Sequence, residues 1–155
     1  MAGKGRTIVV PVDASVHSER AFEWYLENLR QDGDKLNIVN VVEPPRIPAS
    51  FFSPVVVSDE YTTDLQDSIK NAKATTEKFE QKCKAAGLPC TSYTEAADFG
   101  PGEKICEIAR QNKASGIVMG SRGLNVIRKT LLGSVSSYVV NHAHVPVVVT
   151  PPEEK

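Results

Sequence analysis

The sequence predicts a single α/β domain, spanning residues 1–155, that is built on a mainly parallel sheet. Short β-branched segments alternate with segments of helical periodicity along the whole chain. Most of the strand-like segments are almost continuously apolar, which is typical of strands that helices cover on both faces. The composition, with 41% hydrophobic and 24% charged residues, is ordinary for one globular domain.

The first third of the chain predicts a strand, a helix and a second strand. The first strand covers residues 7–12 and ends at Asp13, and Ser15 then has the right position and chemistry for a helix N-cap. Apolar residues at helical spacing continue this helix until Gly33 ends it. The second strand covers residues 36–42, and two prolines stop it abruptly.

Residues 44–59 form a long segment that is rich in proline and contains Phe51 and Phe52. The segment is too apolar for a disordered linker and too often interrupted for a regular element. Loops of this length in a compact domain are usually functional or bind a partner. An insertion whose aromatic side chains cover the edge of the sheet is an equal alternative.

The second half of the chain predicts three more strands and three more helices. Apolar residues spaced four and three apart predict the longest helix from Leu65 to Gly87, packed on the sheet. Polar residues within the next strand, 90–96, favour a sheet edge. The remaining elements follow in order along the chain: a helix after Gly100-Pro101-Gly102, a strand at 117–119, a helix at 131–142 and a strand at 145–150.

Charge and cysteine content exclude several classes of protein. The net charge is −1 without a long block of either sign, so nucleic acid and anionic membranes are not expected as partners. No apolar run is long enough to span a bilayer. The first residues lack a secretory signal and the three cysteines show no C-x-x-C spacing, so we expect a cytoplasmic protein.

The most informative motif follows the fourth predicted strand. Gly120-Ser121-Arg122-Gly123 is followed, after nine residues, by Gly133-Ser134-Val135-Ser136 at a predicted helix start. Glycines let a backbone approach phosphate oxygens closely, and a helix N-terminus presents free N–H groups to an anion. The motif therefore predicts an anion site, with Ser134 and Ser136 as hydroxyl donors. A simple turn followed by a helix start is the alternative that spacing alone leaves open.

This motif resembles the nucleotide-binding signature of the universal stress protein (UspA-like) family, in its ATP-binding branch. Similarity extends to the opening Ile-Val-Val-Pro-Val-Asp-x-Ser and to the closing Val-Pro-Val-Val-Val. The resemblance implies a Rossmann-like fold of the adenine nucleotide alpha hydrolase type. It has an open parallel sheet of strand order 3-2-1-4-5 and helices on both faces. It also implies a homodimer, and the apolar edge strand Val145–Val149 is the expected interface.

The resemblance also assigns the ligand and its contacts. ATP or AMP is the implied ligand, with Mg²⁺ as an accompanying candidate, and Asp13 is expected to accept hydrogen bonds from the ribose. The implied nucleotide-binding residues are Pro11, Val12, Asp13, Val41, Met119, Gly120, Arg122, Gly123, Gly133, Ser134, Val135 and Ser136.

We interpret the chain as a nucleotide-dependent regulator of the stress response. Neither a catalytic residue nor a metal ligand is identified, because phosphoryl transfer needs a positioned base that the sequence does not reveal. Two alternatives stay open at this stage. One is a holdase-like dimer or interaction module that binds no nucleotide, and the other is a slow ATP hydrolase.

Overall fold

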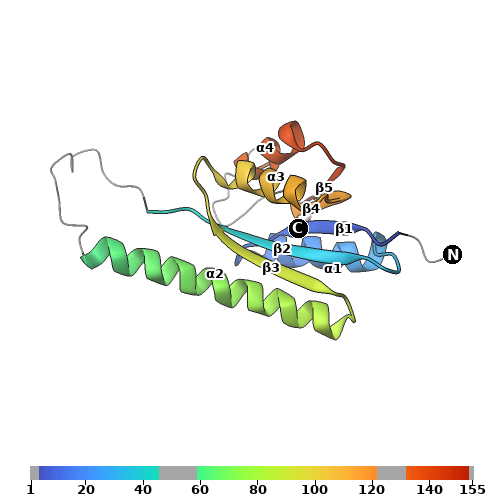
Figure 1. The fold of residues 1–155 in the computed structure, drawn as a ribbon, viewed down its shortest axis with the longest axis horizontal. Helices are drawn as coiled ribbons and strands as arrows, with labels where there is room; N and C mark the ends of the chain where they lie inside the picture. The colour runs from blue at the N-terminus through green and yellow to red at the C-terminus, as the bar shows by residue number, and fades with distance from the viewer. Residues whose placement is uncertain (1–3, 46–58, 122–131, 154–155) are drawn as a thin grey trace.

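The computed structural model describes residues 4–45, 59–121 and 132–153, and within them it contains a five-stranded sheet of order β3-β2-β1-β4-β5 (Figure 1). All neighbouring strands run parallel. The strands are β1 (Thr7–Pro11), β2 (Lys35–Val42), β3 (Cys90–Ala96), β4 (Gly116–Gly120) and β5 (Val147–Thr150). The helices are α1 (Val16–Asn28), α2 (Asp59–Ala85), α3 (Pro101–Gln111) and α4 (Ser134–His142). The predicted fold class and strand order are confirmed.

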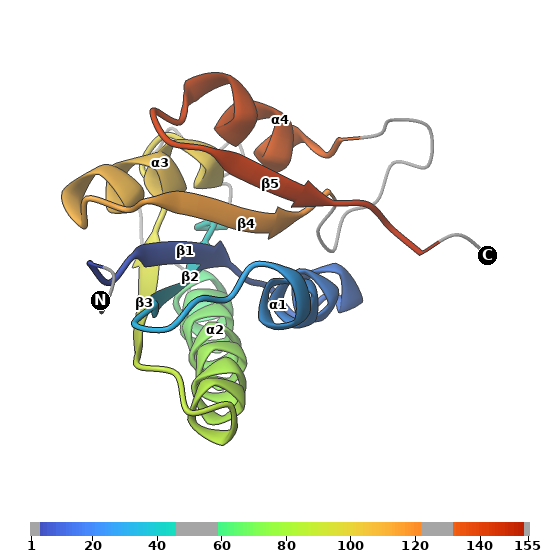
Figure 2. The same cartoon turned by 90° about the vertical axis from the view of Figure 1, so that its right-hand side faces the viewer.

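The helices cover the sheet in two pairs, one pair on each face (Figure 2). Helices α1 and α2 lie on one face, where Phe22 and Phe79 pack edge to face with ring centroids 5.6 Å apart. Helices α3 and α4 lie on the other face, where Ile105, Ile108 and Val139 pack against the sheet. Val9 and Val10 of β1 point into opposite clusters, so the central strand is buried on both sides as its apolar sequence predicts.

The long helix α2 begins at Asp59, six residues before the start that its apolar stripe predicts. From Ala72 onward the stripe is buried against the sheet, whereas Ile69 is 38% exposed. The first turns of α2 therefore extend beyond the sheet, where polar side chains suffice and apolar periodicity is not needed (Figure 1). The helix ends where predicted, before Gly87 with φ of +67°. Most of the predicted 44–59 loop, residues 46–58, lies outside the described residues.

The last helix and the last strand both start later than the sequence predicts. Helix α4 begins at Ser134 instead of 131, because Gly133 has an extended conformation with φ −71° and ψ 169° and acts as the N-cap. Strand β5 begins at Val147 instead of 145. Pro146 has no N–H to donate to β4, so only its carbonyl oxygen joins the ladder, accepting from Ile117 N at 2.9 Å.

A buried charge network ties the start of β1 to the α1–β2 connection. Both oxygens of Asp34 accept hydrogen bonds from the Arg6 guanidinium, at 2.8 and 2.7 Å. The Tyr25 hydroxyl and the Gln31 N–H also donate to Asp34 Oδ2 at 2.6 and 3.0 Å. Although burial opposes ionisation, the hydrogen bonds from Arg6 and Tyr25 outweigh it and lower the pKa of Asp34 to about 2.

This network predicts how the stability of the fold depends on pH. The Asp34 pKa falls from 3.8 when unfolded to about 2 when folded, so ionised Asp34 contributes about 2 kcal/mol above pH 4. The contribution is lost as pH falls from about 4 through 2, because protonation then favours the unfolded chain. Urea denaturation at pH 7 should show that Asp34→Asn lowers the free energy of unfolding. At pH 2 the variant and the wild type should converge, and a difference that is constant with pH would contradict the assignment.

Candidate functional site

A cavity of about 310 Å³ opens at the carboxyl ends of β1 and β4. The chain passes from β1 outward to β2 and β3, then returns to place β4 on the other side of β1. Open α/β sheets bind ligands where the strand order reverses in this way, because the connections leave a crevice between the two strand ends. The volume lies at the lower end of the range for small-molecule sites, about 300–1,000 Å³.

The residues predicted to bind the nucleotide converge on this cavity. Arg122 and Gly123 lie outside the described residues. The other predicted residues all line the cavity wall: Pro11, Val12, Asp13, Val41, Met119, Gly120, Gly133, Ser134, Val135 and Ser136. The topology thus brings together segments more than 100 residues apart in the sequence.

The cavity wall also contains residues that sequence reasoning missed. They are Ser18, Val39, Asn40, Glu43, Pro101, Ile105 and Ser121. Ser121 lies inside the glycine motif, Asn40 lies next to Val41 near the end of β2, and Glu43 follows that strand, so proximity to strand ends was an available signal for these. Pro101 and Ile105 come from α3, which packs across the sheet, and no local pattern connects them to the site.

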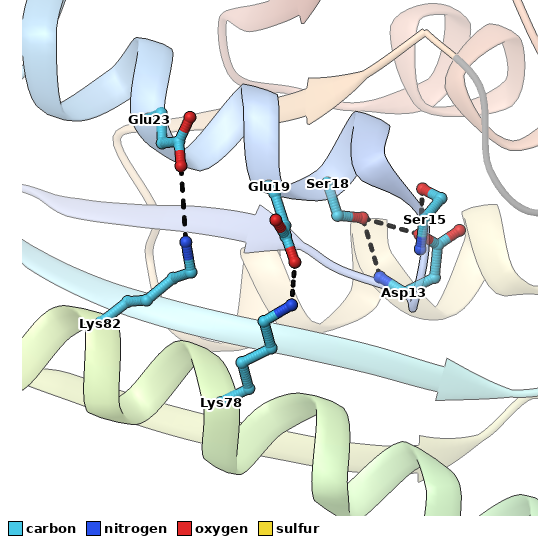
Figure 3. A network of polar contacts seen from close by, with 7 residues as sticks. All are labelled: Asp13, Ser15, Ser18, Glu19, Glu23, Lys78 and Lys82. Atoms are coloured by element: carbon cyan, nitrogen blue, oxygen red, sulfur yellow. Dashed lines mark hydrogen bonds and ion pairs between the residues drawn. The ribbon is translucent and has the colours of Figure 1, made fainter.

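Asp13 is held rigidly by the first turn of α1 (Figure 3). Its Oδ1 atom accepts hydrogen bonds from Ser15 N and from Ser18 Oγ, each at 2.8 Å, and from the Ser15 hydroxyl. Ser18 Oγ in turn accepts from Asp13 N at 2.8 Å. Among the described residues no hydrogen bond reaches Asp13 Oδ2, so this oxygen can accept from a ligand while Oδ1 fixes the carboxylate.

Ser15 occupies the predicted N-cap position of α1, but its side chain does not cap the helix. Its hydroxyl donates a hydrogen bond to the Asp13 carboxylate instead, and the residue is buried beneath the turn. The expectation of a Ser15 cap is therefore correct in position and wrong in its hydrogen bond. The cause is local, because Asp13 lies only two residues before Ser15 and its carboxylate is a strong acceptor for the hydroxyl proton.

At the amino end of α4, which lines the cavity, three backbone N–H groups have no acceptor among the described residues. Helix geometry leaves Ser134, Val135 and Ser136 without intrahelical acceptors for their N–H groups, and no side chain caps the helix. The N–H of Gly133, by contrast, donates to Ser121 O at 2.6 Å. The free N–H groups and the helix dipole together favour a negatively charged ligand group here.

The two serines of the motif differ in what their hydroxyls can do. The Ser136 hydroxyl is buried and donates to Ser121 O at 2.8 Å, with Gly133 O at 3.1 Å. Its only proton is thus donated within the protein in this structure, and its predicted role as a hydroxyl donor to a phosphate stays a prediction. Ser134 is exposed at the cavity, so its hydroxyl remains available.

Ser121 carries an unsatisfied polar atom beside the cavity. The residue is 2% exposed, and among the described residues its Oγ has no hydrogen-bond partner. An unpaired buried hydroxyl costs free energy, and a polar ligand in the adjoining cavity would remove that cost. The unpaired hydroxyl, the free N–H groups of α4 and Asp13 Oδ2 together fit a ligand that carries hydroxyls and an anionic group.

Gly120 is required by packing as well as by any ligand. A β-carbon at this position would lie 2.9 Å from His17 O and 3.0 Å from His17 Cβ, because the start of α1 passes directly over the end of β4. Its φ is not in the left-handed region. A larger residue here would therefore disturb α1 itself, independently of any contact with phosphate.

Two features that the described residues lack bear on the kind of site. No group of three His, Cys, Asp or Glu side chains within them is arranged to hold a metal ion. None of the four helices α1–α4 combines the length and apolar character that crossing a membrane requires.

Comparison with known proteins yields one family match. The model of the universal stress protein family matches residues 5–151 of this chain. A universal stress protein A-like protein of Arabidopsis thaliana is 30% identical over 139 residues, which cover 86% of this chain and 78% of the relative.

Solved structures with the same fold include two that hold adenine nucleotides. A universal stress protein family protein from Arabidopsis thaliana, solved with AMP bound, has a TM-score of 0.63 and 25% identity, covering 93% of this chain and 90% of its own. A universal stress protein in complex with cAMP has a TM-score of 0.61 and 23% identity, covering 94% of this chain and 96% of its own.

The Asp13 network predicts a stability effect that needs no ligand. Ser18→Ala removes a donor to Asp13 Oδ1 and the acceptor of Asp13 N, which are part-buried. We expect the free energy of unfolding in urea to fall by about 1–3 kcal/mol. The matched control Ser134→Ala, at an exposed position, should change it by less than about 0.5 kcal/mol. Equal effects of the two substitutions would refute the structural role of Ser18.

Proposed function

Because the chain belongs to the universal stress protein family, we propose that it binds an adenine nucleotide, AMP or ATP, in the cavity between β1 and β4. The observation that carries the proposal is the set of free N–H groups at the start of α4, facing the same cavity as Asp13 Oδ2. A nucleotide has an anionic end and two ribose hydroxyls, which match these two features. The AMP bound to the Arabidopsis relative supports the same ligand class.

We assign the parts of the nucleotide by chemistry. The phosphates belong at the N–H groups of Ser134, Val135 and Ser136, where the helix dipole favours negative charge. The ribose belongs at Asp13, whose free oxygen can accept from its hydroxyls. The apolar wall that includes Val41 and Met119 suits the adenine ring. Arg122 and Gly123 stay predicted phosphate contacts from the sequence.

Binding at this position suits a regulatory role. The nucleotide would bridge the β1–α1 turn and the start of α4, two segments otherwise joined through the ends of β1 and β4. A ligand that binds only the folded arrangement stabilises it in proportion to the logarithm of its concentration. We propose that the nucleotide level sets the population of this ordered arrangement, with Mg²⁺ entering as a companion of the phosphates when ATP is the ligand.

Proline substitution at Ser134 tests the phosphate assignment sharply. Ser134 is the first residue of α4, where proline is favoured, and Gly133 already has the extended conformation that precedes proline. Ser134→Pro removes the N–H and the hydroxyl, whereas Ser134→Ala removes the hydroxyl alone. Calorimetric titration with AMP and with ATP should show that proline weakens binding about 10- to 100-fold, the value of one hydrogen bond to a charged group.

Ser134→Ala should weaken the binding of AMP and ATP less than Ser134→Pro does, because it keeps the backbone N–H. Unfolding in urea serves as the control for both variants, and each should stay within about 1 kcal/mol of the wild type. If the proline variant bound AMP and ATP as tightly as the wild type does, the phosphates would not bind at the start of α4. No binding of AMP or ATP to the wild type would reject the proposed function as a whole.

We also propose that the chain forms a homodimer through the open edge of β5. Ile117 N and Ser121 N donate to Pro146 O and Thr150 O, so by the parallel pattern the N–H of Val149 points away from β4. A second copy can pair with this exposed edge across a two-fold axis. The apolar β5 sequence is compatible with such burial.

Light scattering should give the wild type twice the mass of one chain. Val149→Pro removes the outward N–H without breaking the β4–β5 ladder, and it should give the mass of one chain with an unchanged circular dichroism spectrum. A wild type that stays monomeric at high concentration would contradict the proposed dimer.

A further inference from the structure

Two cysteines meet at the end of the sheet that lies opposite the cavity. Cys83 is in the last turn of α2, and Cys90 is the first residue of β3. A tight reversal joins them: Leu88 N and Ala86 N donate to Cys83 O at 2.9 and 3.1 Å, and Gly87 takes the left-handed conformation. The reversal folds β3 back along α2 (Figure 1), and Cys83 and Cys90 pack in the same apolar cluster.

The two thiols share one environment but differ in reactivity. Cys83 is fully buried, whereas Cys90 is partly exposed and packs against the same apolar cluster. A hydrogen bond between the two thiols raises the pKa of Cys83, and burial adds to this effect. The same hydrogen bond, with one from the Ile38 N–H, lowers the pKa of Cys90. Cys90 is thus the more nucleophilic and accessible sulfur, and the buried Cys83 belongs to the same cluster.

We propose that Cys83 and Cys90 form a redox-active pair that hydrogen peroxide converts into an intramolecular disulfide. Cys90 thiolate attacks one peroxide oxygen, the O–O bond breaks, and the departing hydroxide takes up a proton to become water. Cys83 sulfur then attacks the Cys90 sulfenic acid, so that an S–S bond forms and the S–O bond breaks. The leaving hydroxide takes the Cys83 proton, and overall two thiols are oxidised while one peroxide is reduced to two waters.

Cys106 provides an internal comparison. It belongs to α3 and packs in the cluster on the opposite face of the sheet. Burial raises the pKa of its thiol, and neither Cys83 nor Cys90 belongs to its cluster. Disulfide formation requires a second thiol in the same cluster, and a single cysteine does not provide one. A thiol of this kind should react slowly and should remain free after the pair has been oxidised.

Peroxide treatment of the full chain, followed by alkylation in denaturant and mass spectrometry, tests the proposal. In the wild type, two of the three thiols should no longer be alkylated. The mass of the chain before alkylation should fall by two hydrogen atoms. Trypsin cleaves after Lys84, so Cys83 and Cys90 leave on separate peptides, joined after oxidation and separate after reduction. Alkylation of all three thiols after peroxide treatment, or loss of Cys106 at the same rate, would overturn the proposal.

Substitutions separate the two steps. Cys106→Ser should still lose two thiols, as the matched control. Cys83→Ala should leave Cys90 without a resolving partner, so its sulfenic acid should progress to the sulfinic acid, seen as a gain of two oxygen atoms. A Cys83→Ala chain that still forms an intramolecular disulfide, or a Cys90→Ser chain that forms one through Cys106, would place the reactive pair elsewhere. Because this site lies at the other end of the sheet, its outcome is independent of nucleotide binding.

Discussion

The carbonyl oxygen of Ser121 holds the start of α4 against the end of β4, and the candidate site depends on this contact. It accepts from Gly133 N at 2.6 Å and from the Ser136 hydroxyl at 2.8 Å. Ser121 N also donates to Thr150 O at 3.0 Å, which aligns β5 with the same point. The contact at Ser121 O fixes the first turn of α4 at the cavity wall, where helix geometry leaves the N–H groups of Ser134, Val135 and Ser136 without intrahelical acceptors. The anion site therefore consists of free backbone N–H groups beside two donors, Gly133 N and the Ser136 hydroxyl, that are already bonded to Ser121 O.

The sheet separates stability from binding by placing them at opposite ends. The carboxyl ends of β1 and β4 carry the cavity, where polar atoms such as Asp13 Oδ2 and Ser121 Oγ lack protein partners. The amino ends carry the saturated network of Arg6, Tyr25 and Asp34, in which both carboxylate oxygens are bonded. An unsatisfied group is costly where it is buried, so the buried Ser121 hydroxyl marks a point at which a polar ligand would supply a missing hydrogen bond.

Much of the fold and of the cavity wall could be predicted because the signals are local. Buried parallel strands have continuous apolar sequences, and the positions after Val12 and Met119 place Asp13 and Gly120 at the strand ends. What could not be predicted is which partner some of the side chains meet. Ser15 donates to Asp13 instead of capping α1, Ser136 donates to Ser121, and Gly120 makes room for His17. In each case a residue of the expected type meets a partner that is distant or unexpected in the sequence.

The central claim is that the backbone of the α4 N-terminus binds the phosphate of an adenine nucleotide. Amide NMR of the isotopically labelled chain during titration with AMP tests it most directly, because each N–H reports its own hydrogen bond. The account predicts that the amide protons of Ser134, Val135 and Ser136 move downfield at a common dissociation constant, while that of Gly133, already bonded to Ser121, moves little. Unchanged amide signals at those three residues, with AMP bound and other signals shifted, would contradict it.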